Sequence, residues 1–503
     1  MHYQEGVARE QAILFPETLD DYISDGNPVQ FIDAFVDSLD LGLLGFRRAE
    51  LEETGRPPYH PGDLLKLYIW GYLNRVRSSR CLEKESQRNV EVMWLIKKLT
   101  PDFKTIADFR KDNREALRKV YKEFTLVCKG LGLFGGELIS IDGSKFRAVN
   151  CKKRNFNRAK LMKRIKEIEE EIERYLQELE ENDAKEATVN GVSAEELKAK
   201  IEWLHKQGKQ YRELLRRLID SGESQISLTD PDSRAMLNNQ RVEVCYNVQA
   251  TVDSKHKLIL DYEVSNEGTD YSHLSEMAQR AKEILRVEKL EALADKGYYS
   301  GEGVKECVEM GVIPFIPEPE REAPPGGVPQ PEFYENKFQY DREGDKYICP
   351  CGCELTFRRD STQNGKVMKI YQGQECWCCE MKAKCTNNLN GRIISRWEHE
   401  EVLEAMRARV KANRQKVRMR QWLSEHSFGT IKRGFNQGYM LLKGLSKVRG
   451  ETGLTFLAYN IKRAVNILGV EALLAAVRKG SCRLGCGHPL PSVLETSASG
   501  CIS

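Results

Sequence analysis

The sequence predicts an α/β protein in which an all-helical N-terminal domain precedes a core built on a mixed sheet. Apolar side chains in the first part of the chain recur at helical spacing. Later, short apolar runs alternate or stop at glycine, which is typical of strands. Two segments of different character, one helical and one rich in cysteine, interrupt these strands. With 503 residues, the chain is long enough for roughly two to four domains.

The helical N-terminal domain is expected over residues 1–130. Phe31, Phe35 and Leu39 keep a rhythm of four residues, which puts them on one face of a helix. Pro61 marks the start of another helix, because proline fits the first helical turn, where no backbone donor is needed. We find no strong strand signal in this part of the sequence.

The core strands are expected in two stretches, residues 131–156 and 222–320. ELISIDG is a short apolar run that ends at Gly143, VEVCYNVQATVD and HKLILDYEVS form a hairpin, and LEALAD is a further strand. A helical pattern, HLSEMAQRAKEIL, separates the hairpin from that strand. Strand, hairpin, helix, strand and then a distant helix is the order of a ribonuclease-H-like core, which we therefore expect.

A helical hairpin is expected to be inserted after the first core strand, over residues 157–221. Apolar residues near heptad spacing predict one helix from Asn157 to Asn182, and a second helix follows the break VNGVS. Two such helices joined by a short loop are typical of an antiparallel pair. The pattern favours a spacer or a dimer contact over a catalytic role.

The rest of the chain is expected to contain a linker, a cysteine-rich insertion and closing helices. Proline and glycine accumulate from VIPFIPEPE onward, so residues 321–395 are assigned to the linker and the insertion. Basic and then apolar helices over residues 396–478 complete the core. Residues 479–503, rich in glycine, serine and cysteine, are predicted to be a loose tail.

Charge is distributed unevenly along the chain. The net charge is only +3, although 30% of the residues are charged. The segment from Arg407 to Arg433, however, contains nine basic residues and one acidic residue, Glu425. The segment from Lys145 to Lys166 is similarly basic. Such patches can follow a phosphate backbone.

The sequence predicts a soluble, cytoplasmic protein without a membrane segment. The N-terminus lacks the pattern of a signal peptide. No run approaches the ~18 apolar residues that a membrane helix needs. In a reducing compartment, the 15 cysteines are expected to be thiols or metal ligands and not disulfides.

Three carboxylates carry the strongest chemical signal. Asp142 in ELISIDGSKFRA and Asp295 in LEALADKGYYS end strand-like runs, whereas Glu425 in WLSEHSFGTIKR belongs to a basic helix. Two acids at strand ends and one on a helix can converge on a pair of divalent ions, which suits phosphodiester cleavage and joining. Taken singly, an aspartate before glycine is more often a turn residue, and a glutamate among cations is more often one partner of a solvated ion pair.

Several phrases, in order from about Phe15 to Leu468, resemble the DDE transposases of bacterial insertion sequences. YHPGDLLKLYIWGYL and PDFKTIADFR are similar to the helical N-terminal region of that family. IDGSKFRA, DPDSRAM, YNVQATVD and ADKGYYS are similar to its catalytic core, and EHSFGTIK and AYNIKR to its closing helices. Several ordered phrases together are far more specific than any one of them.

The resemblance implies a catalytic triad of Asp142, Asp295 and Glu425 that holds Mg²⁺ or Mn²⁺. These hard cations prefer carboxylate oxygens. Lys432 corresponds to the lysine of the family's motif. It follows Glu425 by seven residues, about two α-helical turns, so both are expected on one face of a helix.

The activity implied is DNA transposition: cleavage and joining of DNA at the ends of an insertion sequence by two-metal phosphoryl transfer. The partners are then double-stranded DNA, as terminal inverted repeats and target DNA, and a second copy of the chain in a synaptic homodimer. The bacterial cytoplasm, at the nucleoid when bound to DNA, is the expected location. Two alternatives are a catalytically silent or domesticated relative that holds DNA ends without cutting, and a zinc-containing interaction module.

Basic residues near the three acids are the predicted DNA contacts. The N-terminal helices are expected to recognise the terminal repeats, with Arg75, Arg77, Arg80 and Lys84 as candidates or as solvated surface residues. The residues predicted to contact phosphates are Lys145, Arg147, Lys152, Lys153, Arg154, Arg420, Lys432 and Arg433.

The cysteine-rich segment predicts either a structural zinc site or a set of reduced thiols. Cys376 and Cys379 have the CxxC spacing of a zinc knuckle, and Cys349 and Cys385 complete a tetrahedral quartet at positions that resemble the cysteines of the family. Cys351 or Cys353 can replace one ligand. The alternative is partly buried thiols in a small, strand-rich insertion.

Overall fold

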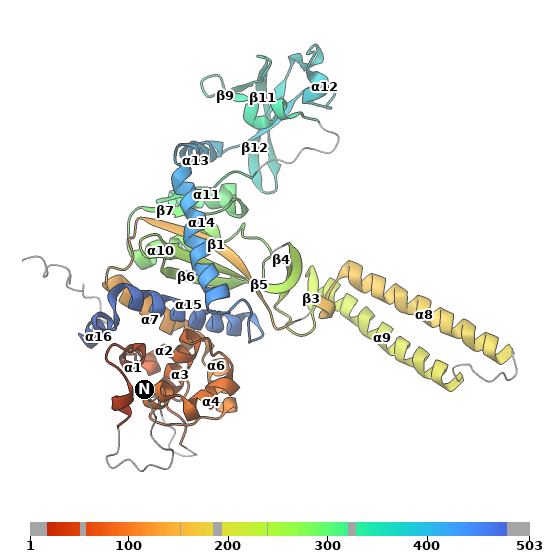
Figure 1. Ribbon diagram of the computed structural model, residues 1–503. Coiled ribbons are helices and arrows are strands. Elements are labelled where there is room, and N and C mark those ends of the chain that lie inside the picture. Colours follow the sequence, from red (N-terminus) through yellow and green to blue (C-terminus); the bar gives the residue numbers. More distant parts are fainter. Residues whose placement is uncertain are drawn as a thin grey trace, which may run out of the picture. The chain divides into compact units, whose positions relative to one another are not determined.

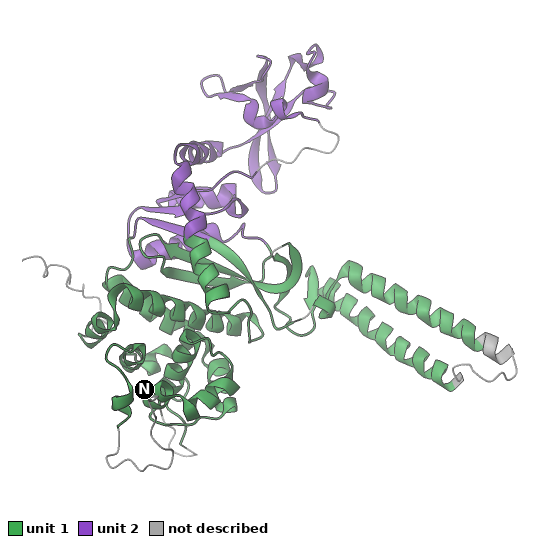
Figure 2. Ribbon diagram, in the orientation of Figure 1, with its two compact units in different colours: residues 1–135, 142–268, 423–503 green, residues 136–141, 269–422 purple. Residues whose placement is uncertain are grey.

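The computed structural model describes residues 18–50, 57–150, 152–184, 194–238, 240–319 and 328–479. The tail predicted over residues 479–503 therefore lies, except for Lys479, outside the described residues, as does part of the predicted linker. The chain divides into two compact units (Figure 2). Unit 1 contains Met1–Gly135, Asp142–Gly268 and Leu423–Ser503, and unit 2 contains Gly136–Ile141 and Thr269–Trp422.

The N-terminal part of unit 1 is a helical layer. Its centre is aromatic: the rings of Phe35 and Phe124 meet edge to face at 5.4 Å, and Phe31 joins them. One helix begins at Pro61, as predicted. The helices are α1 (Pro28–Asp37), α2 (Leu41–Leu44), α3 (Pro61–Leu73), α4 (Ser79–Arg88), α5 (Val90–Leu95), α6 (Phe103–Asp112) and α7 (Arg114–Gly130).

In unit 1, β5 pairs antiparallel with β4 and β6 and also lies beside β1. The predicted hairpin is present: Val248 pairs with Val264 and Ala250 with Tyr262. Alternate residues of β5 are apolar, but nearly the whole strand is buried, which fits a strand covered on both faces. These strands are β4 (Arg234–Asn238), β5 (Arg241–Asp253), β6 (Ile259–Ser265) and, beside β5, the second half of β1 (Leu138–Arg147).

Strand β1 is longer than predicted. We expected it to end at Gly143, yet it continues to Arg147. The continuation is held by a distant segment, because Arg147 N donates to Gly438 O at 3.2 Å and Met440 N donates to Arg147 O at 2.8 Å. Glycine therefore marks no strand end here.

In unit 2, the first half of β1 lies in a parallel ladder with β7 (Leu290–Leu293) and β8 (Val312–Phe315). Ser140 pairs with Leu293, and Leu293 pairs with Phe315. From the sequence, VIPF begins the proline- and glycine-rich stretch and no strand is expected there, so β8 corrects that expectation. Its proline is tolerated because β8 is an edge strand, where a missing donor costs no ladder bond. Parallel and antiparallel pairing together make the protein an α/β protein with a mixed sheet.

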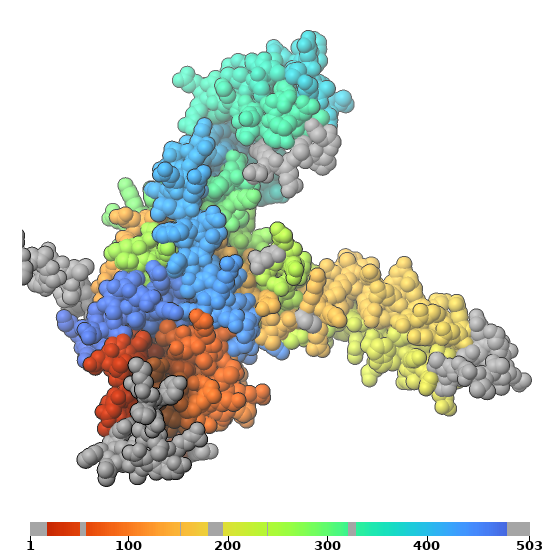
Figure 3. All heavy atoms as spheres, in the orientation of Figure 1, coloured from red at the N-terminus to blue at the C-terminus, as the bar shows by residue number. Residues whose placement is uncertain are grey.

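The predicted helical hairpin belongs to unit 1 and is made of α8 (Arg158–Ala184) and α9 (Ala194–Asp220) (Figure 1). Apolar residues of both helices form a shared core that includes Ile168, Ile172, Leu197 and Leu204. The short strands β2 (Asn155–Asn157) and β3 (Gln225–Ser227) pair antiparallel at its base. In the space-filling view the two helices form one continuous rod (Figure 3).

The closing helices of unit 1 centre on α15 (Leu445–Leu468), which is followed by α16 (Val470–Arg478). Helix α15 packs on α7, α3 and β6. The buried Asn460 side chain accepts from Ile259 N at 2.9 Å and donates to Ile259 O at 2.7 Å, so it fixes α15 to the start of β6. Helix α15 thereby joins the N-terminal helices to the sheet.

The rest of unit 2 contains α10 (Leu274–Leu285), α11 (Gly301–Glu309) and a second, antiparallel sheet in the order β13-β12-β11-β10-β9. Seven of the chain's 15 cysteines lie in the segments that connect its strands, and its core includes Tyr347 and Tyr371. Its strands are β9 (Gln339–Asp341), β10 (Lys346–Ile348), β11 (Glu354–Gln363), β12 (Lys366–Gly373) and β13 (Ile393–Trp397). Helices α12 (Lys382–Cys385), α13 (Glu400–Ala412) and α14 (Arg414–Gly429) complete the list.

Candidate catalytic and nucleic-acid site

Asp142 lies within β1 and Asp295 lies shortly after the end of β7, and both side chains are half-buried. Asp142 belongs to β1 in unit 1, and its Oδ1 accepts from Gly143 N at 2.9 Å. Asp295 belongs to unit 2, two residues after the end of β7, where its Oδ1 accepts from Gly297 N at 2.8 Å. Each carboxylate thus has one short backbone contact that fixes the orientation of its side chain.

Glu425 is exposed on α14, in the part of that helix that belongs to unit 1. The next turn packs on β1, because the rings of Phe428 and Phe146 lie 6.2 Å apart. Ser424 and Ser427 on the same helix are fully buried. The elements that carry Asp142 and Glu425 are therefore in contact within unit 1.

Lys432 follows α14 in a π-helical turn, Thr430–Gly434. The α-helical spacing used to place Lys432 on the same face as Glu425 therefore does not hold, because the helix type changes at residue 430. The Lys432 Nζ donates to Lys145 O at 2.8 Å and lies 4.7 Å from the centre of the Phe146 ring. Burial, reinforced by the nearby Lys145, lowers the pKa of Lys432 to about 8, whereas Cys245 and Asp142 act in the opposite direction.

Within the described ranges, no group of three or more His, Cys, Asp or Glu side chains is arranged to hold a metal ion, so the three acids form no preformed metal site there. The donor chemistry of three carboxylates does fit a hard divalent cation. Asp142 and Glu425 lie on packed elements of unit 1, and Asp295 lies in unit 2.

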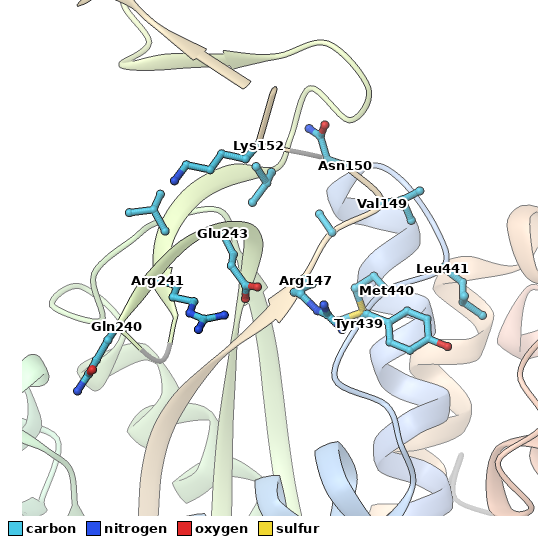
Figure 4. A pocket seen from close by; sticks show the side chains of 13 residues that line it. Arg147, Val149, Asn150, Lys152, Gln240, Arg241, Glu243, Tyr439, Met440 and Leu441 are labelled. Atoms are coloured by element: carbon cyan, nitrogen blue, oxygen red, sulfur yellow. The ribbon is translucent and has the colours of Figure 1, made fainter. Parts of the chain in front are cut away.

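A large basic hollow opens beside the end of β1 in unit 1 (Figure 4). Its volume is about 1050 Å³. Two of the predicted phosphate contacts, Arg147 and Lys152, line it together with Arg241 and Tyr439, which the sequence analysis missed. The full lining is Arg147, Ala148, Val149, Asn150, Lys152, Gln240, Arg241, Val242, Glu243, Val244, Tyr439, Met440 and Leu441. Three cations against one acid suit an anionic ligand.

Tyr439 forms one wall of this hollow, and a buried ion pair between Arg77 and Glu451 holds the segment around it. Arg77, which is 6% exposed, donates to Tyr439 O at 2.9 Å, and its guanidinium lies 4.5 Å from the centre of the Tyr439 ring. Fully buried Glu451 lies 3.6 Å from Arg77 and accepts from Leu441 N and Leu442 N, both at 2.9 Å. The sequence offered Arg77 as a DNA contact or a solvated residue, and both readings are wrong because the side chain is buried.

The remaining predicted DNA contacts differ in exposure. Lys152, Lys153 and Arg154 are exposed in a short turn that precedes the helical hairpin, and Arg433 is exposed after α14. Lys145 is half-buried, and so is Arg420, which lies in the part of α14 that belongs to unit 2. Their exposure suits phosphate contact best at residues 152–154.

Six cysteines gather around a cavity of about 20 Å³ in unit 2, roughly the room that one water-sized particle needs. Two thiols already accept backbone bonds: Cys353 N donates to Cys349 Sγ at 3.2 Å and Arg392 N donates to Cys376 Sγ at 3.4 Å. Burial, followed by the charge of neighbouring thiols, raises the pKa of Cys351 and of Cys353 to about 11. The cysteines that line the cavity are Cys349, Cys351, Cys353, Cys376, Cys379 and Cys385.

Every cysteine in the described part of the chain is a free thiol.

None of the helices described combines the length and the apolar character that a membrane span requires.

Comparison with protein families identifies two segments of the chain. Residues 17–112 match a transposase domain (DUF772), and residues 348–465 match a transposase DDE domain. Both are models of transposase domains, and the two matches support a DDE-type transposase. The first match lies within the helical layer. The second runs from the cysteine-bearing sheet into α15 and includes Glu425 and Lys432, but not Asp142 or Asp295.

Other comparisons add little. No curated protein matches this transposase. Among solved structures, the cryo-EM structure of a piggyBac transposase synaptic complex with hairpin DNA matches 91% of this chain and 79% of its own chain, with 9% sequence identity and a TM-score of 0.30.

Proposed function

We propose that this transposase cuts and joins DNA at the ends of a bacterial insertion sequence, with Asp142, Asp295 and Glu425 as its catalytic acids. The observation that carries the proposal is the match of residues 348–465, which include Glu425, to a transposase DDE domain. Asp142 and Asp295 complete the proposed set because they stand in the sequence phrases that resemble the catalytic core of this family.

The packing of α14 supports the inclusion of Glu425. Asp142 and Phe146 are four residues apart on a strand, so their side chains leave the same face of the sheet. Glu425 and Phe428 are three residues apart on a helix, so they lie on neighbouring positions of one side. The Phe146 and Phe428 rings lie 6.2 Å apart, so the surface of β1 that carries Asp142 packs near the side of α14 that carries Glu425. This packing supports a shared site for these two acids. A mixed sheet with a helix of this kind is what a ribonuclease-H-like core requires.

In the proposed mechanism the three carboxylates would hold two Mg²⁺ or Mn²⁺ ions, which when bound would supply the electrostatic stabilisation that an in-line phosphoryl transfer needs. The chain's own task is to hold the DNA strand. Arg147, Lys152 and Arg241 offer cations beside the hollow. The same site serves hydrolysis at the element end and attack by the freed 3′-hydroxyl on target DNA, so no protein nucleophile is needed.

The proposed partners are the terminal inverted repeats and the target DNA, bound by a homodimer during synapsis. The helical layer that matches the DUF772 transposase domain is proposed to recognise the repeats. In unit 2 we propose a structural zinc ion held by Cys349, Cys376, Cys379 and Cys385. The gathering of thiols around a small cavity supports it, because tetrahedral zinc sites in proteins are built from such cysteines.

A strand-cleavage assay on labelled DNA that contains the element ends tests the proposal. Asp142→Asn, Asp295→Asn and Glu425→Gln are each expected to abolish divalent-dependent nicking while DNA binding persists. The matched control is Glu471→Gln, which removes an exposed carboxylate on α16 and is expected to leave nicking unchanged. Binding without any nicking by the wild-type protein would favour a silent relative that only holds DNA ends.

A further inference from the structure

The helical hairpin has a strong polarity of charge along its length. Residues 152–166 contain eight basic and no acidic side chains, and residues 206–217 contain five basic and one acidic side chain. The intervening residues 167–205 contain thirteen acidic and four basic side chains. The two basic segments are far apart in sequence, yet each flanks the acidic one.

The packing of α8 against α9 brings the two basic segments together at the base of the hairpin. The Phe156 and Tyr211 rings meet at 5.5 Å, and Leu161 and Leu218 share one apolar cluster. We call residues 152–166 and 206–217 the basic root of the hairpin. The described residues of the acidic segment, on α8 up to Ala184 and on α9 from Ala194, form the part of the two helices beyond the root.

Part of the positive charge of the root is exposed to a ligand, and part is paired with acids of the hairpin. On α9, Lys206 and Lys209 are exposed and lie one helical turn apart, and a hollow of about 870 Å³ follows this side of the helix. Other cations of the root pair with acids of the hairpin: Arg212 with Glu169 at 2.6 Å, Arg164 with Glu167 at 3.0 Å, Lys166 with Glu170 at 3.6 Å, and Arg216 and Arg217 with Glu213 at 3.2 and 3.3 Å. The positive charge of the root is therefore only partly offset within the hairpin.

The basic root is continuous with the hollow beside β1. Lys152 lines that hollow and is also the first residue of the root, and Lys153 and Arg154 follow it directly. The cations thus run without an acidic interruption from the hollow into α8. A second copy of the acidic segment could also match the charge of the root, but it would not explain this continuity with the proposed DNA path.

We propose that the basic root of the hairpin binds the phosphates of double-stranded DNA that extends from the hollow, and that the acidic segment beyond it stays off the DNA. A helical segment of 12 residues spans about 18 Å. Duplex DNA presents about one negative charge per 1.7 Å of its axis, so the root faces roughly ten phosphate charges. The identity of this DNA as element DNA rests on the proposed function, whereas its class as duplex DNA rests on the charge pattern.

Paired substitutions on one helix test the proposal in the full-length protein. Lys206→Gln with Lys209→Gln removes two charges from the root, and the matched control, Lys198→Gln with Lys200→Gln, removes two charges from exposed positions of α9 beyond it. The dissociation constant for a duplex of about 40 base pairs is measured by fluorescence anisotropy across salt concentrations. Each lost phosphate contact lowers the salt slope by about 0.9.

The root variant is expected to lower the salt slope by between about 1 and 2 and to weaken binding several-fold. The control is expected to match the wild type in slope and affinity, with equal helix content in both by circular dichroism. Equal effects of the two pairs, or no effect of either, would overturn the proposal. A root variant that changes the oligomeric mass in sedimentation but not the salt slope would assign the root to contact between copies and would also overturn it.

The outcome is separable from that of the proposed function. Asp142→Asn is expected to bind the same duplex with the wild-type salt slope. Nicking that survives in Asp142→Asn would count against the catalytic assignment and leave the hairpin result intact, because the anisotropy measurement does not depend on cleavage.

Discussion

The buried pair of Arg77 and Glu451 makes a quantitative prediction about the segment that walls the basic hollow. In Glu451→Ala, Leu441 N and Leu442 N lose their acceptor and Arg77 loses a carboxylate 3.6 Å away. Removing one partner of a buried ion pair costs about 3–5 kcal/mol. Because Arg77 keeps its bond to Tyr439 O, we take the lower end, about 3 kcal/mol.

Hydrogen–deuterium exchange at the amides of Leu441 and Leu442 measures this effect locally. A loss of about 3 kcal/mol corresponds to roughly 100-fold faster exchange, since each 1.4 kcal/mol is tenfold. Glu451→Gln keeps one acceptor oxygen and is expected to show a smaller acceleration. Glu115→Gln, at an exposed glutamate, is the control. Unchanged exchange in Glu451→Ala would refute the view that this pair holds the wall.

Two further predictions concern charge and metal. Because the pKa of Lys432 is lowered to about 8, its amino group loses its positive charge as the pH rises through that value. The affinity for DNA at constant salt is therefore expected to fall between pH 7 and 9. Lys432→Arg, which stays charged, is expected to flatten this pH profile. A pH profile that is the same in wild type and Lys432→Met would contradict this. Purified protein is expected to contain about one zinc per chain, and Cys379→Ser is expected to lose it; elemental analysis that finds no zinc in the wild type would show that the thiols are simply reduced.

Local patterns were predicted well from the sequence. The helix that starts at Pro61, the hairpin of β5 and β6, and the pair α8 and α9 are all present, because hydrophobic periodicity and turn residues act over short distances. The strand Val312–Phe315 was missed because its proline and the proline-rich sequence after it are typical of a linker.

Features that depend on distant partners were not predictable in the same way. Strand β1 extends to Arg147 because Gly438 and Met440 supply its bonds. Arg77 is buried because it contacts Tyr439, which lies 362 residues further along the sequence. Nothing in the local sequence signals either contact. The change to a π-helical turn before Lys432 likewise depends on packing and not on spacing.

The three proposed catalytic acids were predicted from sequence phrases, and the structure adds the elements that carry them. Asp142 and Glu425 lie on β1 and α14, which pack on each other through Phe146 and Phe428. Their common role with Asp295 remains a prediction that depends on bound cations.

The most direct test of that role is a change of metal preference at each acid. Asp142→Cys, Asp295→Cys and Glu425→Cys replace a hard oxygen ligand with a softer sulfur, which accepts Mn²⁺ more readily than Mg²⁺. We predict that all three variants lose nicking with Mg²⁺ and that at least one regains it with Mn²⁺, while the wild type works with both. Full nicking with Mg²⁺ in any of the three would contradict the account of paired cations held by these carboxylates.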